Sequence, residues 1–268
     1  MSMISVSNLT FAYEGSYDNV FENVSFQIDT NWKLGFIGRN GRGKTTFLNL
    51  LMGKYAYSGT INKDVQMKYF PYAVNDVSKY TIEVMQDICP FAEDWEFLKE
   101  TSLLDVDAEA LYRPFETLSN GERTKVLLAA LFLSPNSFLL IDEPTNHLDI
   151  DTIAWLTNFL KSSKKTVLFI THDRYFLDNV ATRIFELDQA NLIEYQGNYQ
   201  DYVRLKAEQD ERDAAALHKK KQLYKQELAW MRTQPQARAT KQQARINRFK
   251  DLKGEVHQTV NNDDLEIN

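Results

Sequence analysis

The stretch that decides the fold is Gly38-Arg39-Asn40-Gly41-Arg42-Gly43-Lys44-Thr45-Thr46. It fits the pattern G-x-x-x-x-G-K-[ST], in which the main-chain N–H groups of a glycine-rich loop surround a polyphosphate. Both flanks agree, because residues 34–37 predict a buried strand and residues 46–52 predict a helix that ends before Gly53. Lys44 would contact the outer phosphates, and the Thr45 hydroxyl would bind Mg2+. The alternative is a glycine turn that precedes a lysine by chance, and the two flanks argue against it.

Composition indicates a globular protein. The chain has 268 residues, of which 43% are hydrophobic and 12% aromatic, enough for a sizeable core. No apolar run approaches the roughly 20 residues that cross a bilayer, and the first residues lack the pattern of a signal peptide. We therefore expect a cytoplasmic protein with no membrane partner. The single cysteine, Cys89, rules out an internal disulfide and a cysteine cluster for a metal.

The net charge of −6 is unevenly distributed. Residues 203–254 hold 14 Lys and Arg against 6 Asp and Glu, a charge of +8, which leaves −14 for the rest of the chain. This basic segment predicts a long exposed helix over residues 202–232, a break at 233–236 and a second helix over 238–252. It is a candidate for nucleic-acid contact; the alternative is a solvated helical face.

The remaining pattern predicts an α/β fold. Alternating burial in the first 70 residues is typical of an antiparallel, half-exposed layer, whereas apolar runs before residues 142 and 172 predict buried strands of a central sheet. Helical periodicity over about residues 75–130 predicts a helical insertion. Strands are predicted at residues 4–9, 24–28, 59–61, 66–70, 138–141, 166–171, 183–188 and 192–195.

Polar residues follow two of the buried strands. Asp142 ends one strand and could bind Mg2+, and Glu143 beside it could polarise the water that attacks a γ-phosphate. His172 follows the next strand and could bond the γ-phosphate, since ligands bind at the carboxyl ends of strands in α/β sheets. The alternatives are two acids at a strand end by chance and a histidine that caps the following helix.

Two further features could bind nucleotide. Ser119, in the sequence LSNGE of residues 118–122, is placed to cap a helix whose free N–H groups form an anion site. Alone, this pattern is better explained as an ordinary helix cap. Tyr13 lies in a turn-rich segment 25 residues before Gly38 and could stack on adenine, or could only cover a turn.

These motifs, in this order and spacing, resemble an ABC-type ATPase domain over residues 1 to about 200. The motif EPTNHLD at 143–149, followed by THDRYFL at 171–177, resembles the ABC-F class. The resemblance implies a P-loop ABC ATPase fold with a mixed sheet core, an antiparallel β layer and a helical insertion, followed by an extended helical hairpin. It implies an ATPase domain at 1–198, a basic hairpin linker at 199–254 and a polar tail at 255–268. Members of this class carry two ATPase domains on one chain and have no membrane part.

The resemblance also implies roles for single residues. Glu143 would be the catalytic base, His172 the switch histidine and Lys44 a catalytic phosphate contact, with ATP and Mg2+ as cofactors. Thr45 and Asp142 would hold the metal. The nucleotide would be bound by Tyr13, Gly38, Arg39, Asn40, Gly41, Arg42, Gly43, Lys44, Thr45 and Thr46, and by Ser119, Asn120, Gly121 and Glu122 of the opposite ATPase domain.

The chain departs from the family pattern in two places. Tyr72 stands where a glutamine ligand of Mg2+ and water is expected, and Asn120 replaces the first signature glycine. A non-catalytic, ATP-gated module is therefore the first alternative to an ATPase. The ATPase half resembles the antibiotic-resistance branch of ABC-F, whereas the hairpin, with ELAWMR at 227–232 and TKQQARI at 240–246, resembles the short-tipped translation-factor branch.

The partners follow from the same resemblance. One phosphate loop and one signature make half of each of two sites, so we expect a second ABC domain, in a longer chain or in a second copy. The basic hairpin is expected to contact the ribosome through rRNA or tRNA. The remaining alternative, the ATP-binding subunit of a transporter, has no use for a basic hairpin.

Overall fold

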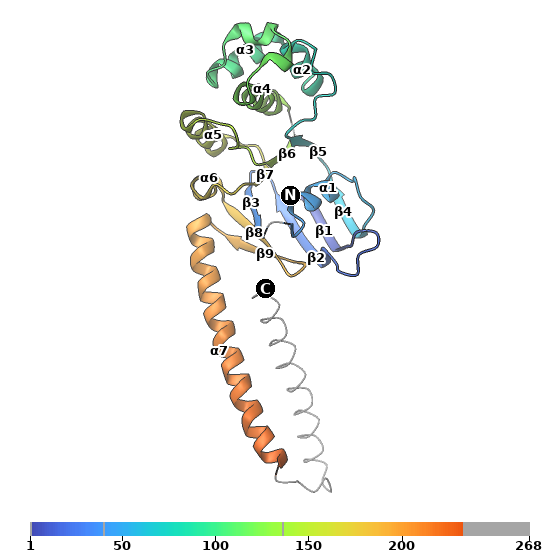
Figure 1. Cartoon of the computed structure of the whole chain (residues 1–268), viewed down its shortest axis with the longest axis vertical. Coiled ribbons are helices and arrows are strands. Elements are labelled where there is room, and N and C mark those ends of the chain that lie inside the picture. Colours follow the sequence, from blue (N-terminus) through green and yellow to red (C-terminus); the bar gives the residue numbers. More distant parts are fainter. Residues whose placement is uncertain (1, 40, 136, 233–268) are drawn as a thin grey trace. The chain divides into compact units, whose positions relative to one another are not determined.

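The computed structural model describes residues 2–39, 41–135 and 137–232. The chain divides into two compact units, Met1–Tyr202 and Val203–Asn268, and each is described by itself (Figure 1). The predicted second helix over 238–252, the break at 233–236 and the tail at 255–268 lie outside the described residues. The domain boundary expected after residue 198 stays a prediction.

The first unit is built on a six-stranded sheet in the order β5-β6-β7-β3-β8-β9. Neighbours from β5 to β8 pair in parallel, and only β9 runs antiparallel, next to β8. The parallel strands therefore end at one common edge, where ligands bind in such sheets. The strands are β3 (Lys33–Gly38), β5 (Gln66–Phe70), β6 (Ser137–Asp142), β7 (Val167–Ile170), β8 (Arg183–Asp188) and β9 (Asn191–Gln196).

A second, antiparallel sheet has the order β2-β1-β4, with β1 (Ser2–Phe11), β2 (Phe21–Asp29) and β4 (Ser58–Lys63). It confirms the predicted half-exposed layer for three of its four strands. The assignment of residues 66–70 to this layer is wrong, because β5 pairs in parallel with β6, Tyr69 opposite Leu140. Five residues of mixed polarity do not show which sheet a strand joins.

Helix α1 (Lys44–Leu51) joins the two sheets through one aromatic side chain. The Phe47 ring centroid lies 4.8 Å from that of Phe36 on β3, and 5.6 Å and 5.5 Å from those of Phe21 and Phe26 on β2. Phe47 is fully buried in the main core, together with Leu48 and neighbouring residues. Aromatic pairs at these distances stabilise beyond their buried area. The start of α1, where the phosphate loop ends, is thus held by the core.

The helical insertion is present and gathers at one end of the first unit (Figure 1). Its longest helix, α4, runs to Leu133, three residues beyond the expected end of the insertion. Two further helices, α5 (Ile150–Ser162) and α6 (Arg174–Val180), follow strands of the central sheet. The insertion consists of α2 (Thr81–Ile88), α3 (Asp94–Leu103), the short 3-10 turns at Ala108–Tyr112 and Phe115–Thr117, and α4 (Asn120–Leu133).

Helix α7 (Tyr199–Arg232) has 34 residues and begins three residues earlier than the sequence predicts. Its first turn belongs to the first unit, where the Tyr202 hydroxyl donates to Glu186 at 2.9 Å and the Tyr202 ring lies 5.1 Å from that of Tyr195. The described part in the second unit carries i,i+4 ion pairs from Glu208 to Arg204 and Arg212. Such pairs support an exposed helix. In the described part of the chain, no helix is long and apolar enough to cross a membrane.

The N-cap residue of α5, Asp149, is expected to stabilise the folded protein. The Asp149 carboxylate accepts from the Thr152 main-chain N–H at 2.8 Å and from its hydroxyl at 3.0 Å, and these bonds lower the pKa of Asp149 to about 2. We expect Asp149→Ala to lower the free energy of unfolding at pH 7 by about 1 kcal/mol. The folded pKa is below the unfolded value of about 3.9, so this advantage of the wild type is present above pH 4 and is lost as the pH falls towards 2.

Urea unfolding at several pH values measures this effect. Asp149→Asn is the matched control, because its side-chain oxygen can still cap the helix but does not titrate over this range. Equal stability of wild type and Asp149→Ala at pH 7 would show that the cap contributes nothing.

Candidate nucleotide-binding site

The phosphate loop lies between the carboxyl end of β3 and the first turn of α1, as predicted. Gly41 and Gly43 have φ angles of 78° and 109°, in the left-handed region that glycine adopts without strain. A Cβ at Gly43 would also overlap Val20 Cγ1. Arg39 and Arg42 are exposed on the outer part of the loop, and Asn40 lies outside the described residues.

Lys44 is directed at the loop itself. Its Nζ donates to the Gly38 carbonyl oxygen at 2.6 Å. Burial lowers the pKa of Lys44, and the nearby Glu143 and Asp142 carboxylates partly oppose this. The ammonium is therefore already placed beside the groups that would surround a phosphate.

The two predicted acids follow β6. Thr45 Oγ1 donates to Asp142 Oδ2 at 3.3 Å, and burial raises the pKa of Asp142. Two hard oxygens this close suit Mg2+, which is bound by one or two protein groups together with substrate phosphates and water. No cluster of three or more His, Cys, Asp or Glu side chains suited to a metal occurs among the residues described. A metal held by Thr45, Asp142 and phosphate fits this arrangement, and an all-protein metal cage does not.

Glu143 and His172 come together from neighbouring strands. β6 and β7 are paired in parallel, so the residues that follow them meet at the same edge of the sheet. His172 Nε2 lies 3.6 Å from Glu143 Oε1. Glu143 has a φ of 52°, which is unfavourable for a residue other than glycine, and its main-chain N–H donates to the Ile170 oxygen at 2.8 Å. A hydrogen bond of the main chain thus holds Glu143 in a strained backbone conformation, with its carboxylate beside the histidine.

A cavity of about 480 Å³ contains most of the predicted residues. Its volume lies within the range of small-molecule sites, and it combines the glycine loop, one ammonium and two acids. ATP with Mg2+ therefore fits the residues present. Of the predicted site residues, the cavity is lined by Tyr13, Gly41, Gly43, Lys44, Thr45, Thr46, Asp142, Glu143 and His172.

Tyr13 stands at this cavity with its ring partly free. Its hydroxyl shares a hydrogen bond of 2.6 Å with Thr46 Oγ1, and its ring makes edge contacts with Phe11 and Tyr55. The side chain is 44% exposed. Edge contacts leave a ring face available for stacking on a base. Tyr17, in the same segment, is fully exposed and does not line the cavity.

The four signature residues lie elsewhere. Ser119 caps α4: its hydroxyl accepts from the Glu122 N–H at 3.3 Å, and its own N–H donates to Glu122 Oε2 at 2.8 Å. These bonds with Ser119 lower the pKa of Glu122. None of Ser119, Asn120, Gly121 and Glu122 lines the cavity of the phosphate loop. The first turn of α4 could therefore serve a nucleotide of another domain and not the one bound here.

Sequence reasoning missed Tyr69. Its hydroxyl donates to Asp142 Oδ2 at 3.3 Å, and burial, followed by the Asp142 charge, raises the pKa of Tyr69 to about 12. Tyr69 and Asp142 also line a neighbouring cavity of about 470 Å³, which Tyr72 does not line. Only the parallel register of β5 and β6 reveals this contact, because the two residues are 73 positions apart.

Tyr69 is expected to position the metal ligand. Loss of its hydroxyl in Tyr69→Phe leaves Asp142 with one fewer donor, and removal of such a supporting bond costs about tenfold in metal affinity. We expect nucleotide binding in the presence of Mg2+ to weaken by that factor and binding in EDTA to stay unchanged. Titration with a fluorescent ATP analogue measures both. An equal loss with and without Mg2+ would assign Tyr69 to packing alone.

The chain is similar to known ATP-binding proteins. Two family models described as ABC transporter match the chain, ABC_tran over residues 21–146 and ABC_tran_Xtn over residues 185–267. The energy-dependent translational throttle protein EttA of Haemophilus influenzae is 31% identical over 91% of this chain and 52% of its own length. The ATP-binding protein Uup of Buchnera aphidicola is 32% identical over 95% of this chain and 44% of its own. The uncharacterized ABC transporter ATP-binding protein YfmR of Bacillus subtilis is 30% identical over 94% and 47%.

The fold has a counterpart among solved structures. A chain from an ABC transporter in an inward-facing conformation aligns with a TM-score of 0.61 over 73% of this chain and 83% of its own, at 24% identity. Fold and site together define an ATP-binding-cassette ATPase domain, the class whose members bind ATP, typically with Mg2+, and hydrolyse it. The chain contains an ABC transporter ATP-binding domain, and its relatives EttA and Uup are proteins of the ABC-F family. It spans about half the length of the curated relatives it matches.

Proposed function

We propose that this chain is the ATP-binding and hydrolysing module of an ABC-F factor that works on the ribosome together with a second ABC domain. One observation carries the catalytic part of the proposal. The hydroxyl of Thr45, the carboxylates of Asp142 and Glu143, and the His172 ring meet at one edge of the central sheet, around the cavity of the phosphate loop.

Each of these groups has a task that its position supports. The phosphate loop and Lys44 bind the polyphosphate, and Thr45 with Asp142 hold Mg2+, which neutralises charge on the phosphates. Glu143 accepts a proton from the attacking water. His172, 3.6 Å from Glu143, orients this carboxylate and contacts the γ-phosphate. Tyr13 stacks on the base.

The second ABC domain is proposed from the position of the signature. Because Ser119 to Glu122 do not line the cavity of the phosphate loop, they are available to a nucleotide that is bound by the partner domain. Closure of two such domains on ATP, and their release after hydrolysis, would couple the nucleotide to a movement.

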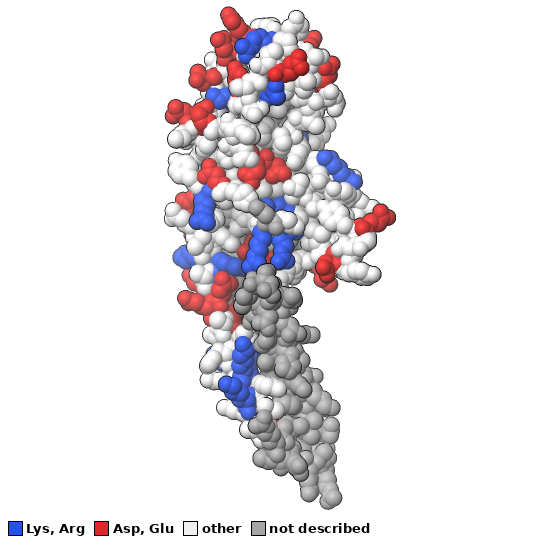
Figure 2. Space-filling model, viewed as in Figure 1, with Lys and Arg blue, Asp and Glu red and all other residues white. Residues whose placement is uncertain are grey.

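The ribosome is proposed from the charge distribution. The described part of α7 contains the run Lys219–Lys221, and a cluster of basic side chains is visible on this helix in Figure 2. The helical insertion is opposite in charge, with 11 Asp and Glu against 3 Lys and Arg between residues 76 and 116. RNA attracts the first surface and repels the second. The name of one relative, a translational throttle protein, also supports a role in translation.

Ribosome co-sedimentation tests this proposal. We expect Glu143→Gln, in a protein that contains both ABC domains, to be retained on ribosomes with ATP and released with ADP. Neutralising Lys219–Lys221, together with the sequence-predicted contacts Arg238, Lys241, Arg245 and Arg248, should weaken retention and reduce its dependence on salt, because fewer counterions are released. ATP binding should be unaffected. Unchanged retention of these variants on ribosomes would show that the basic segment does not contact the ribosome.

A non-catalytic, ATP-gated module is the second candidate. Tyr72 stands where the family has a metal-binding glutamine, and its side chain does not line the cavity beside Asp142 and Glu143. Hydrolysis by the two-domain protein, compared with that by Glu143→Gln, distinguishes the two candidates. A transporter subunit is supported less well, and co-fractionation with membranes would favour it.

A further inference from the structure

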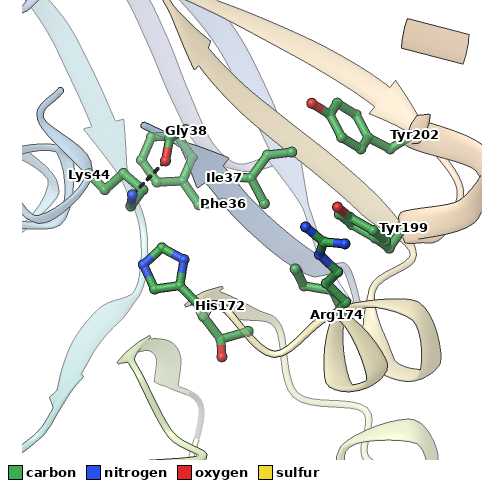
Figure 3. A pocket seen from close by; sticks show the side chains of 10 residues that line it. Phe36, Ile37, Gly38, Lys44, His172, Arg174, Tyr199 and Tyr202 are labelled. Carbon is green, nitrogen blue, oxygen red and sulfur yellow. Dashed lines mark hydrogen bonds between the residues drawn. The ribbon is translucent and has the colours of Figure 1, made fainter. Parts of the chain in front are cut away.

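A separate cavity of about 380 Å³ adjoins the nucleotide cavity on the side of α6 and α7. The two cavities share Lys44 and His172, which line both. In the view of Figure 3, His172 stands between Lys44 on one side and Arg174 on the other. A group that leaves the phosphate loop past Lys44 and His172 would therefore enter this second cavity.

The lining of the second cavity is basic. Lys44, His172 and Arg174 are its ionisable side chains besides two tyrosines, and no Asp or Glu lines it. Glu143 approaches His172 but lines the nucleotide cavity instead. Asp173 is next to Arg174 in the chain, but its carboxylate caps α6 by accepting from the Phe176 N–H at 3.0 Å. The Glu143 and Asp142 carboxylates thus act on Lys44 and His172 from the nucleotide cavity, whereas the lining itself places no carboxylate beside Arg174.

Arg174 is the side chain that distinguishes this cavity from the phosphate loop. Its guanidinium lies 6.0 Å from the centre of the Tyr199 ring, at the start of α7. Among the residues that the structure describes, Arg174 forms no ion pair and no hydrogen bond with another side chain. A cation–π contact leaves the N–H groups of a guanidinium free to donate in the plane of the group. Bidentate recognition of phosphate uses those same donors.

Tyr199 and Tyr202 line the side of the cavity opposite His172 (Figure 3). The Tyr202 hydroxyl is committed to Glu186, and the Tyr199 ring lies 5.8 Å from that of Tyr202. Tyr199 is thereby held where its face meets Arg174. The Arg174 side chain is exposed, and the Tyr199 ring is the neighbour that its guanidinium faces at the cavity.

We propose that this cavity is a binding site for inorganic phosphate, in which Arg174, with Lys44 and His172, holds the product after it has left the nucleotide site. The biological source of the phosphate rests on the proposed hydrolysis, in which ATP and water give ADP, inorganic phosphate and a proton. The site itself is a property of the cavity.

Equilibrium dialysis of radiolabelled inorganic phosphate against the full chain tests the proposal. Saturating ADP and Mg2+ are present throughout, so that the α- and β-phosphate positions of the loop are filled, and the Arg174 variants distinguish the proposed site from the open γ-phosphate position. We expect wild-type protein to bind one phosphate per chain, and Arg174→Gln to weaken this binding about tenfold, the effect of losing one charge-assisted contact. Arg174→Lys should retain part of the affinity. Lys161→Gln is the matched control, an exposed cation that contacts Asn179 on α6 but does not line the cavity.

The outcomes separate this inference from the proposed function. ADP and ATP-analogue affinities are measured for each variant with a fluorescent nucleotide. If the nucleotide binds but phosphate does not, or binds equally to wild type and Arg174→Gln, this inference is wrong and the ATPase proposal stands. A loss of ATP-analogue affinity in Arg174→Gln, with ADP affinity unchanged, would assign Arg174 to the γ-phosphate and would also overturn it. Phosphate binding that depends on Arg174 in a chain that binds no nucleotide would support the site and count against the ATPase.

Discussion

Glu143→Gln is expected to slow ATP hydrolysis by about 10²- to 10⁴-fold, the contribution of a general base. The amide keeps the size of the side chain and can still accept a hydrogen bond from water, but it cannot take the proton. Glu143 does not belong to the phosphate loop, so ATP affinity should be retained. The strained main chain at Glu143 is held by its bond to Ile170, which does not involve the side chain, so the fold should also be unchanged.

Phosphate release in a single turnover measures this effect, in a protein that contains both ABC domains. Glu109→Gln is the control, because Glu109 is an exposed acid of the helical insertion that lies outside both acid-lined cavities beside Asp142. Hydrolysis by Glu143→Gln at the wild-type rate would assign the base to another residue. Equally slow hydrolysis by Glu143→Gln and by the control Glu109→Gln would favour an ATP-gated module without catalysis.

Lys44→Ala is expected to weaken ATP binding by about 10- to 100-fold, since hydrogen bonds to charged groups contribute about 1.5–3 kcal/mol each. The ammonium now donates to Gly38 within the loop and lies at the cavity that would hold the phosphates. The effect should be larger for ATP than for AMP, because only the outer phosphates reach this group.

Nucleotide titration by fluorescence or calorimetry gives these affinities. Lys63→Ala is a matched control: Lys63 also donates from Nζ to a main-chain carbonyl, that of Leu51 at 2.9 Å, but does not line the nucleotide cavity. A similar loss of ATP affinity in both variants would indicate a general effect on stability. Unchanged affinity in Lys44→Ala would show that the ammonium does not reach the phosphates.

The sequence pattern was sufficient to predict those parts of the candidate site whose residues are consecutive in the chain. The phosphate loop was predictable because its glycines, lysine and threonine are consecutive, and the same holds for Ser119 as a cap and for Asp142 and Glu143 at a strand end. The fold class followed from the strands and helices around these motifs, and the ABC-F resemblance from their order. Helix and strand boundaries were predicted less well. α1 and α7 begin two and three residues before the predicted starts, because capping turns have weak sequence signals.

The sequence by itself thus determined the class of the protein, the candidate residues of its nucleotide site and the basic character of residues 203–254. The tertiary structure alone decided which distant residues meet. Parallel pairing placed β5 beside β6 and brought Tyr69 to Asp142, and the order of the sheet opened a second cavity where Arg174 faces Tyr199. The physical reason is that strand register and the packing of helix ends depend on contacts between segments far apart in the chain, which a local pattern of side chains does not encode.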